Sequence, residues 1–322
     1  MDQGNVAGSR TSQSGLRVVT GMRTCLTITL AAVCLWAITA SSASAGGDPP
    51  TLAACGQTLW ITSEAGVSEA DAATGRTLRH LQASRPYATG VVCDAGHAYV
   101  TSVENGYIAG SVDRFDARSG RRTRIESRGG GIFGIALAFG RVFVIAGSRQ
   151  LHVVEVAHGT APELELKDRH PAWIVGGSAL TIVDNDGLLR QRSRSGRERV
   201  LARGIEWPAV PCAAGILVAA RGRLRLIAAM PSAWSVPVRP VALACRGTTA
   251  WVATSDAAGQ STVVRRRQMV DGSSLRRVRI KGSAVAVALT PRVVWVATVG
   301  QAERLVGLDP QTLRVISART IF

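Results

Sequence analysis

The chain has 322 residues, of which 46% are hydrophobic and 19% are charged. This composition excludes an intrinsically disordered protein, which would hold fewer apolar and more charged residues. There are 38 basic and 22 acidic residues, a formal net charge of +16, and every basic residue except Lys167 and Lys281 is arginine. The length allows one large domain or two ordinary ones.

The N-terminal segment, residues 1–45, predicts export. Met22-Arg23-Thr24 opens an apolar run over residues 25–39, and small residues ending in Ala43-Ser44-Ala45 follow it. This is the pattern of a secretory signal peptide, and we expect cleavage after Ala45. An uncleaved anchor is disfavoured because a spanning helix needs about 20 apolar residues. Since the segment from Met22 is a complete signal peptide, translation from Met22 is a further hypothesis.

The mature protein is therefore expected to be residues 46–322, secreted or periplasmic, with no membrane span. It carries a repeat of about 40 residues, whose clearest part is a β-prone run led by an aromatic or aliphatic residue. The seven copies are Leu59-Trp60-Ile61-Thr62, Ala98-Tyr99-Val100-Thr101, Val142-Phe143-Val144-Ile145, Leu180-Thr181-Ile182-Val183, Ile216-Leu217-Val218-Ala219, Ala250-Trp251-Val252-Ala253 and Val294-Trp295-Val296-Ala297.

A strand of small residues precedes most copies, and a turn such as Asp71-Ala72-Ala73-Thr74-Gly75 follows. Four short strands per unit and seven units predict an all-β fold, a seven-bladed β-propeller with four antiparallel strands per blade. Six or eight blades stay open because the fourth and fifth copies are irregular. We expect an inner strand at 51–55 and an outer strand at 313–321. Each blade would then be built from consecutive residues, and the ring of blades would close by packing between blades one and seven.

Three motifs carry a family resemblance: Gly134-Ile135-Ala136, Trp251-Val252-Ala253 and Asp309-Pro310-Gln311-Thr312. They resemble the repeats of secreted YVTN/YncE-type bacterial propellers and are similar to those of streptogramin-lyase-like propellers. The resemblance covers nearly all of residues 46–322. It implies a seven-bladed disc with a central channel, located in the cell envelope or outside the cell.

The mature cysteines occupy equivalent places in four repeats. Cys55, Cys93, Cys212 and Cys245 each lie five or six residues before the main residue of the next strand. In an exported protein this pattern predicts disulfides between neighbouring blades, Cys55–Cys93 and Cys212–Cys245. Buried free thiols are the alternative. No Cys-x-x-Cys spacing indicates a metal site, and we expect no metal or cofactor.

The arginines cluster in the predicted outer strands. The functional interpretation is a surface for a polyanion such as a cell-wall polymer, because guanidinium groups bind phosphate and carboxylate in pairs of hydrogen bonds. The alternative is a solvated rim shaped by an arginine-rich coding bias. Nucleic acid is not expected, because aromatic residues are only 5% of an exported chain. The candidate contacts are Arg121, Arg122, Arg265, Arg266, Arg267, Arg276 and Arg277.

The residues before two inner strands are the candidates for a ligand site. His170 and Trp173, and then Glu206 and Trp207, fall near the starts of inner strands in adjacent blades, and we expect them at the channel mouth. Either charged residue there is more often structural or solvated than functional. By contrast, Trp60, Trp251 and Trp295 occupy repeat positions of the core between blades, and Trp234 is expected to be exposed with Trp173 and Trp207.

No catalytic residues are predicted. A streptogramin-lyase-like site needs His and Glu converging on one face with a divalent metal, yet no His-x-Glu or Glu-x-His pair occurs. The sequence therefore favours a non-enzymatic, monomeric scaffold that binds a protein or a cell-envelope polymer. The alternatives are a metal-dependent lyase or hydrolase of the same fold and an arginine-driven polyanion binder.

Overall fold

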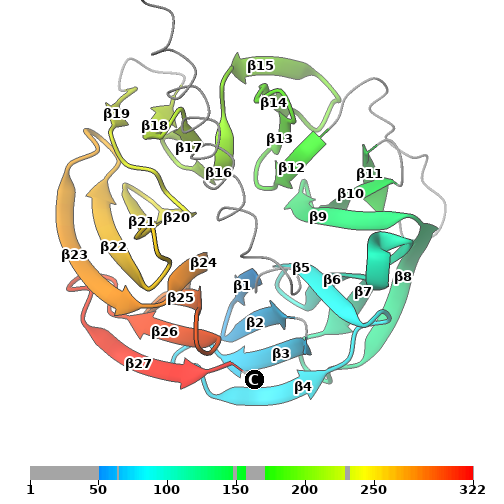
Figure 1. Ribbon diagram of the computed structural model, residues 1–322. Coiled ribbons are helices and arrows are strands. Elements are labelled where there is room, and N and C mark those ends of the chain that lie inside the picture. The colour runs from blue at the N-terminus through cyan, green and yellow to red at the C-terminus, as the bar shows by residue number, and fades with distance from the viewer. Residues whose placement is uncertain (1–50, 64, 148–150, 157–170, 229–232, 322) are drawn as a thin grey trace, which may run out of the picture. The chain divides into compact units, whose positions relative to one another are not determined.

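The computed structural model describes residues 51–63, 65–147, 151–156, 171–228 and 233–321. The chain divides into two units, Met1–Gly46 and Gly47–Phe322, and all of the described residues belong to the second. The predicted signal peptide and its cleavage site lie outside the described residues. In the described unit, antiparallel sheets follow one another around a centre, and their first strands lie innermost (Figure 1).

Each sheet is one blade, a meander of consecutive strands in which every strand pairs with the next one along the chain. Blade one comprises β1 (Thr51–Cys55), β2 (Thr58–Ser63), β3 (Gly66–Asp71) and β4 (Thr77–Leu81). Blade two comprises β5 (Tyr87–Cys93), β6 (His97–Val103), the 3-10 turn η1 (Asn105–Tyr107), β7 (Ala109–Asp116) and β8 (Arg122–Gly129). Blade three comprises β9 (Gly131–Ala138), β10 (Arg141–Gly147) and β11 (His152–Val156).

The remaining four blades repeat the pattern. Blade four comprises β12 (Pro171–Val175), β13 (Leu180–Asp184), β14 (Leu189–Arg192) and β15 (Glu198–Ala202). Blade five comprises β16 (Glu206–Cys212), β17 (Gly215–Ala220), β18 (Arg223–Ile227) and β19 (Ser235–Val236). Blade six comprises β20 (Ala242–Arg246), β21 (Thr249–Ser255), β22 (Ser261–Gln268) and β23 (Ser274–Lys281). Blade seven comprises β24 (Ser283–Leu289), β25 (Val294–Val299), β26 (Arg304–Leu308) and β27 (Val315–Thr320).

The fold is thus an all-β, seven-bladed propeller, and the prediction of its class is confirmed. In blade three, the stretch that follows β11 lies outside the described residues, so three strands are described there. No helix of the described chain is both apolar enough and long enough to cross a bilayer.

The second strand of each blade is buried because both of its faces pack against neighbouring blades. Trp60 and Trp295 are fully buried and Trp251 is 3% exposed. Trp60 packs with Phe115 of blade two, and Trp251 packs with Val294 and other residues of blade seven. The prediction that these tryptophans form the core between blades is confirmed. Burying each ring removes a large apolar area from water, and truncation to alanine typically costs about 3–5 kcal/mol.

Blades one and seven close the ring without sharing a strand, as predicted. Trp295 of β25 packs against Leu59 and Ile61 of β2. Its indole Nε1 also donates a 2.9 Å hydrogen bond to the carbonyl of Ala72. The ring lies on Gly75, where a Cβ atom would come within 2.5 Å of the indole.

A second tryptophan makes the same contacts between blades five and six. Trp234 Nε1 donates a 2.7 Å hydrogen bond to the carbonyl of Met269, and the ring lies on Gly272. Gly75 and Gly272 each end the turn between the third and fourth strands with a positive φ, which glycine adopts at little cost. The prediction that Trp234 is exposed is therefore wrong, because this side chain joins two blades.

Candidate functional site

The meander gives the propeller two distinct faces. Turns between strands one and two, and between strands three and four, lie at one end of every blade, because neighbouring strands run in opposite directions. This end is called the disulfide face here, since Cys55 and Cys93 lie on it at the ends of β1 and β5. The opposite end holds the starts of the inner strands and the turns between strands two and three. It is called the aromatic face, for the residues described next.

Trp173 and Trp207, two of the predicted ligand contacts, meet on the aromatic face. They come from the inner strands β12 and β16 of adjacent blades, and their rings pack edge to face with centroids 5.1 Å apart. Trp207 is 56% exposed, and Glu206 beside it is also exposed. Trp173 is half-buried, so its predicted exposure is wrong, because its ring packs between the cores of neighbouring blades. His170 lies outside the described residues.

An irregular register explains why Trp207 leaves the sheet. In β16, Glu206 pairs with Ala219 but the next regular pair is Ala209 with Val218, so two residues bulge out of the ladder. Similar register shifts occur early in β5, β12 and β24. A bulge re-aims side chains and ends regular pairing. In blade five it turns an indole from the core towards solvent.

A second aromatic pair on this face escaped the sequence analysis. Tyr107 of η1 stacks on Phe133 of β9, with centroids 5.4 Å apart and ring planes 24° apart. Both side chains are about two-fifths exposed, and the neighbouring Ile108 is 69% exposed. The available signal was Phe133, the one aromatic residue in an inner strand otherwise made of glycine, alanine and aliphatic residues.

Polar groups lie beside this second pair. Arg85 forms an ion pair with Glu104, which directly precedes η1. A polar rim around exposed aromatic rings is the usual composition of a protein-binding surface.

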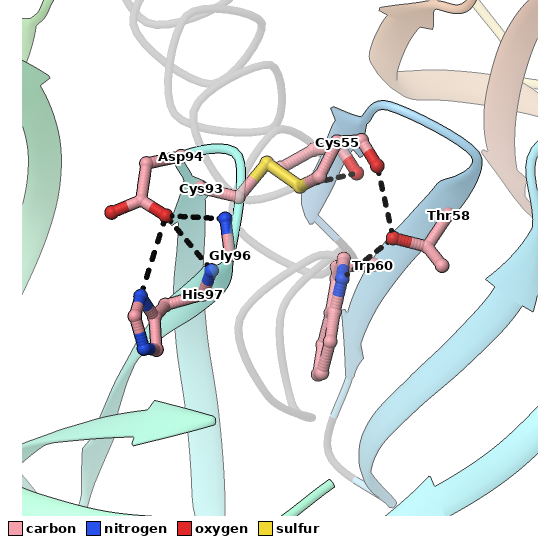
Figure 2. Close-up of a disulfide and its surroundings, with 8 residues drawn as sticks. Cys55, Thr58, Trp60, Cys93, Asp94, Gly96 and His97 are labelled. Atoms are coloured by element: carbon pink, nitrogen blue, oxygen red, sulfur yellow. Dashed lines mark hydrogen bonds and ion pairs between the residues drawn. A yellow bond between two sulfur atoms is a disulfide. The ribbon is translucent and has the colours of Figure 1, made fainter. Parts of the chain in front are cut away.

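The two disulfides are present as predicted, and each joins the inner strands of consecutive blades. Cys55–Cys93 links blades one and two with a Cα separation of 5.9 Å, and Cys212–Cys245 links blades five and six with 5.7 Å. Both separations suit a disulfide. Figure 2 shows the first bridge above Trp60 and next to the turn that begins at Asp94.

That turn also positions a histidine. One carboxylate oxygen of Asp94 accepts hydrogen bonds from the backbone N–H groups of Gly96 and His97, both 2.8 Å long, and lies 3.5 Å from His97 Nδ1 (Figure 2). Burial raises the pKa of Asp94, but the two backbone hydrogen bonds, a hydrogen bond from Tyr99 and the attraction of His97 together outweigh burial, so the pKa is lowered overall. Tyr99 donates a 3.0 Å hydrogen bond to the same carboxylate. The pKa of Tyr99 rises to about 12, and burial of its side chain is the largest cause. Asp94 therefore acts as a structural anchor of the turn.

The described histidines do not converge. His80, His97 and His152 lie on blades one, two and three. Among the described residues, no group of three His, Cys, Asp or Glu side chains is placed to hold a metal ion.

The predicted polyanion contacts fall into two separate groups. Arg121 lines a hollow of about 410 Å³ on blade two with His97 and Asp116, and Arg122 donates a hydrogen bond to the carbonyl of Gln82. The rest of the set lies together on the third and fourth strands of blade six, namely Arg265, Arg266, Arg267, Arg276 and Arg277.

Comparisons with known proteins establish the fold alone. No family model and no curated protein matches the chain, so the YVTN/YncE resemblance stays a prediction. The computationally designed protein Ika8 aligns with a TM-score of 0.59 and 13% identity, over 85% of this chain and 88% of that one.

Two natural proteins align similarly. The WD40 β-propeller domain of Doa1 gives a TM-score of 0.57 and 12% identity, over 72% of this chain and 81% of that one. The dihydro-heme d1 dehydrogenase NirN, solved in complex with DHE, gives 0.57 and 13% identity, over 87% of this chain and 67% of that one. At this identity the shared property is the propeller architecture.

Proposed function

We propose that the protein is an exported, non-enzymatic binding scaffold that docks a protein partner on its aromatic face. The observation that carries the proposal is the set of exposed aromatic rings on that face, Tyr107 stacked on Phe133, and Trp207 packed on the half-buried Trp173. Tyrosine and tryptophan supply a large contact area with few rotatable bonds, which is why they are enriched at protein interfaces.

The position of the pairs supports a rigid docking surface. Each pair joins neighbouring blades, so the rings are held by the sheets on both sides. The exposed Ile108 adds apolar area, and the Arg85–Glu104 ion pair provides a polar edge. An apolar centre with a charged rim suits a folded protein surface better than a uniformly charged polymer.

Export is supported by two separate features. Disulfides persist in oxidising compartments and are rare in the cytosol, and this chain carries two between equivalent positions of its repeat. The N-terminal segment has the signal-peptide pattern. N-terminal sequencing of the protein recovered outside the cytoplasm is expected to begin at Gly46.

The test is affinity capture by the C-terminally tagged protein from the envelope fraction of the producing cell. We expect one discrete protein partner that survives moderate salt. The double variant Trp207→Ala/Phe133→Ala should weaken capture at least about tenfold, since exposed aromatic residues commonly dominate interface energy. Val270→Ala/Ile316→Ala is the matched control, because both residues are more than half exposed but lie elsewhere.

Equal capture by both double variants would place the partner on another surface and overturn the docking proposal.

An enzymatic role would instead appear as turnover of a substrate by the purified protein. We infer that such turnover is absent.

A further inference from the structure

The outer half of blade six carries like charges directly opposite each other. In the β22–β23 register, Arg265 pairs with Arg277 and Arg266 pairs with Arg276. Like charges opposite each other in a sheet repel and destabilise it. Such an arrangement destabilises the free protein, and an anion bound between the arginines would offset the repulsion.

Alternation along the strands divides these cations between two sides of the sheet. Val264, Val278 and Ile280 pack towards blade seven. Residues that alternate with them therefore face blade five. They form a set called here the basic ladder: Arg265, Arg277, Arg279 and Lys281. Alternate residues on one strand are about 6.7 Å apart, so the charges of β23 form a regular row.

Acidic groups near the ladder are few. Residues 241–281 contain eight basic residues, and their only acidic residues are Asp256 and Asp271. Asp256 attracts Arg279 but is held by hydrogen bonds from Ser261 and Gln260. The facing blade, residues 205–240, contains Glu206 as its only acidic residue, and Glu206 begins the inner strand β16.

A buried arginine on the same side of the sheet as the ladder, Arg267, makes only part of its possible hydrogen bonds. Arg267 is 7% exposed, and its Nη1 donates a hydrogen bond to the carbonyl of Gly272. Its buried Nε has no hydrogen-bond partner among the described residues. Burial, and secondarily the nearby Arg265, lower the pKa of Arg267. Its charge adds to the positive potential on this side of the sheet.

The ladder ends at a hollow. Lys281, its last member, also lines a cavity of about 530 Å³ between the loops of blades six and seven. Arg304 is the only other charged residue in its lining, and glycines, glutamines and a threonine make up much of the rest. The pocket lies towards blade seven, whereas the other ladder residues face blade five, so only Lys281 belongs to both.

We infer that the basic ladder binds a linear polymer that carries phosphate groups. Guanidinium groups form paired hydrogen bonds with phosphate oxygens, and a row with regular spacing matches a repeating anion better than a single one. The basic ladder lies on the outer strands of blade six, away from the aromatic pairs of blades two to five. The inference also goes beyond the proposed docking of a protein, so either proposal stands without the other.

The test measures binding of fluorescent long-chain polyphosphate by anisotropy, over a series of salt concentrations. In the variant Arg277→Ser/Arg279→Ser, affinity at low salt should fall roughly tenfold. The slope of log affinity against log salt should decrease by about two, since each phosphate contact contributes close to one. The matched control is Arg194→Ser/Arg197→Ser, which removes the same charge from exposed residues of blade four.

Thermal unfolding of both variants confirms that each remains folded. A larger loss in the ladder variant than in the control supports the inference. Equal losses would mean that only net charge matters and would overturn it, as would an absence of polyphosphate binding at low salt. Tighter binding of polygalacturonate, a linear polymer that carries carboxylates and no phosphate, would overturn the assignment to phosphate polymers.

Discussion

Blades one and six place opposite charge patterns at the same position of the repeat. In blade one, Glu69 of β3 lies opposite Trp60 on one side and opposite Arg79 of β4 on the other. In blade six, the equivalent neighbours of Trp251 are Arg266 and then Arg276. Glu69 is 1% exposed and neutralised by Arg79, whereas the blade-six pair repels.

The two blades nevertheless make the same contact with the next blade. Arg79 donates a hydrogen bond to the carbonyl of Arg118, and Arg266 donates one to the carbonyl of Gln311. Arg118 and Gln311 each follow by two residues the aspartate that begins a turn. One arginine is therefore enough to join neighbouring blades, and the residue opposite it is free to serve stability or binding.

The largest expected effect comes from the disulfide that reinforces blade one. Cys55→Ser/Cys93→Ser removes a bridge between residues 38 positions apart, and chain entropy predicts a loss of about 4 kcal/mol in the free energy of unfolding. Denaturant unfolding measures it. The control is Cys212→Ser/Cys245→Ser, with a separation of 33 and a similar expected loss. A loss below about 1 kcal/mol would show that blade packing alone fixes this junction.

The next effect tests the buried ion pair. Arg79→Ala leaves the carboxylate of Glu69 buried without its partner, and we expect a loss of about 3 kcal/mol. In Glu69→Leu/Arg79→Leu no charge remains, so at least half of that stability should return. If the double variant is less stable than Arg79→Ala, the ion pair itself stabilises the blade.

A smaller effect comes from giving blade six the charges of blade one. Arg276→Glu replaces repulsion towards Arg266 with attraction, and we expect a gain of about 0.5 kcal/mol at low salt. The gain should shrink as salt rises. Arg314→Glu makes the same charge change at an exposed position of blade seven and is expected to leave stability nearly unchanged. An equal gain in both variants would point to net charge instead.

The smallest effect is a pH dependence specific to blade one. Burial raises the pKa of Glu69 above 4.5, more than Arg79 lowers it. The folded state then binds more protons than the unfolded state above pH 4.5, so Glu69 lowers stability as pH rises through its folded pKa. Relative to the wild type, Glu69→Gln should flatten unfolding free energy against pH in that window. An unchanged profile would contradict the assignment.

Most of the fold could be predicted from the sequence repeat. Tryptophan or another large residue recurs about every 40 residues, and small residues precede it, so the number of blades and the path of the chain followed from local pattern. The disulfides were predictable for the same reason, because Cys55 and Cys93 occupy equivalent places in adjacent units. A repeat fixes which positions become neighbours.

Side chains that do not follow the repeat pattern were harder to place from the sequence. Trp207 was predicted to be exposed and is, but Trp234 has a similar irregular sequence context and joins two blades instead. The pairing of Tyr107 with Phe133 also escaped the sequence, because it joins a turn of one blade to a strand of the next. Such contacts depend on how blades face each other.

The repeat length, the positions of the cysteines and the abundance of arginine are properties of local pattern or composition, so the propeller, its disulfides and its positive charge could be predicted from the amino-acid sequence. Which arginines share a side of a sheet, and which aromatic rings meet, could not be predicted in this way, because strand register and blade packing set these distances. Arg265 and Arg277 are 12 positions apart in the chain but directly opposite each other in blade six.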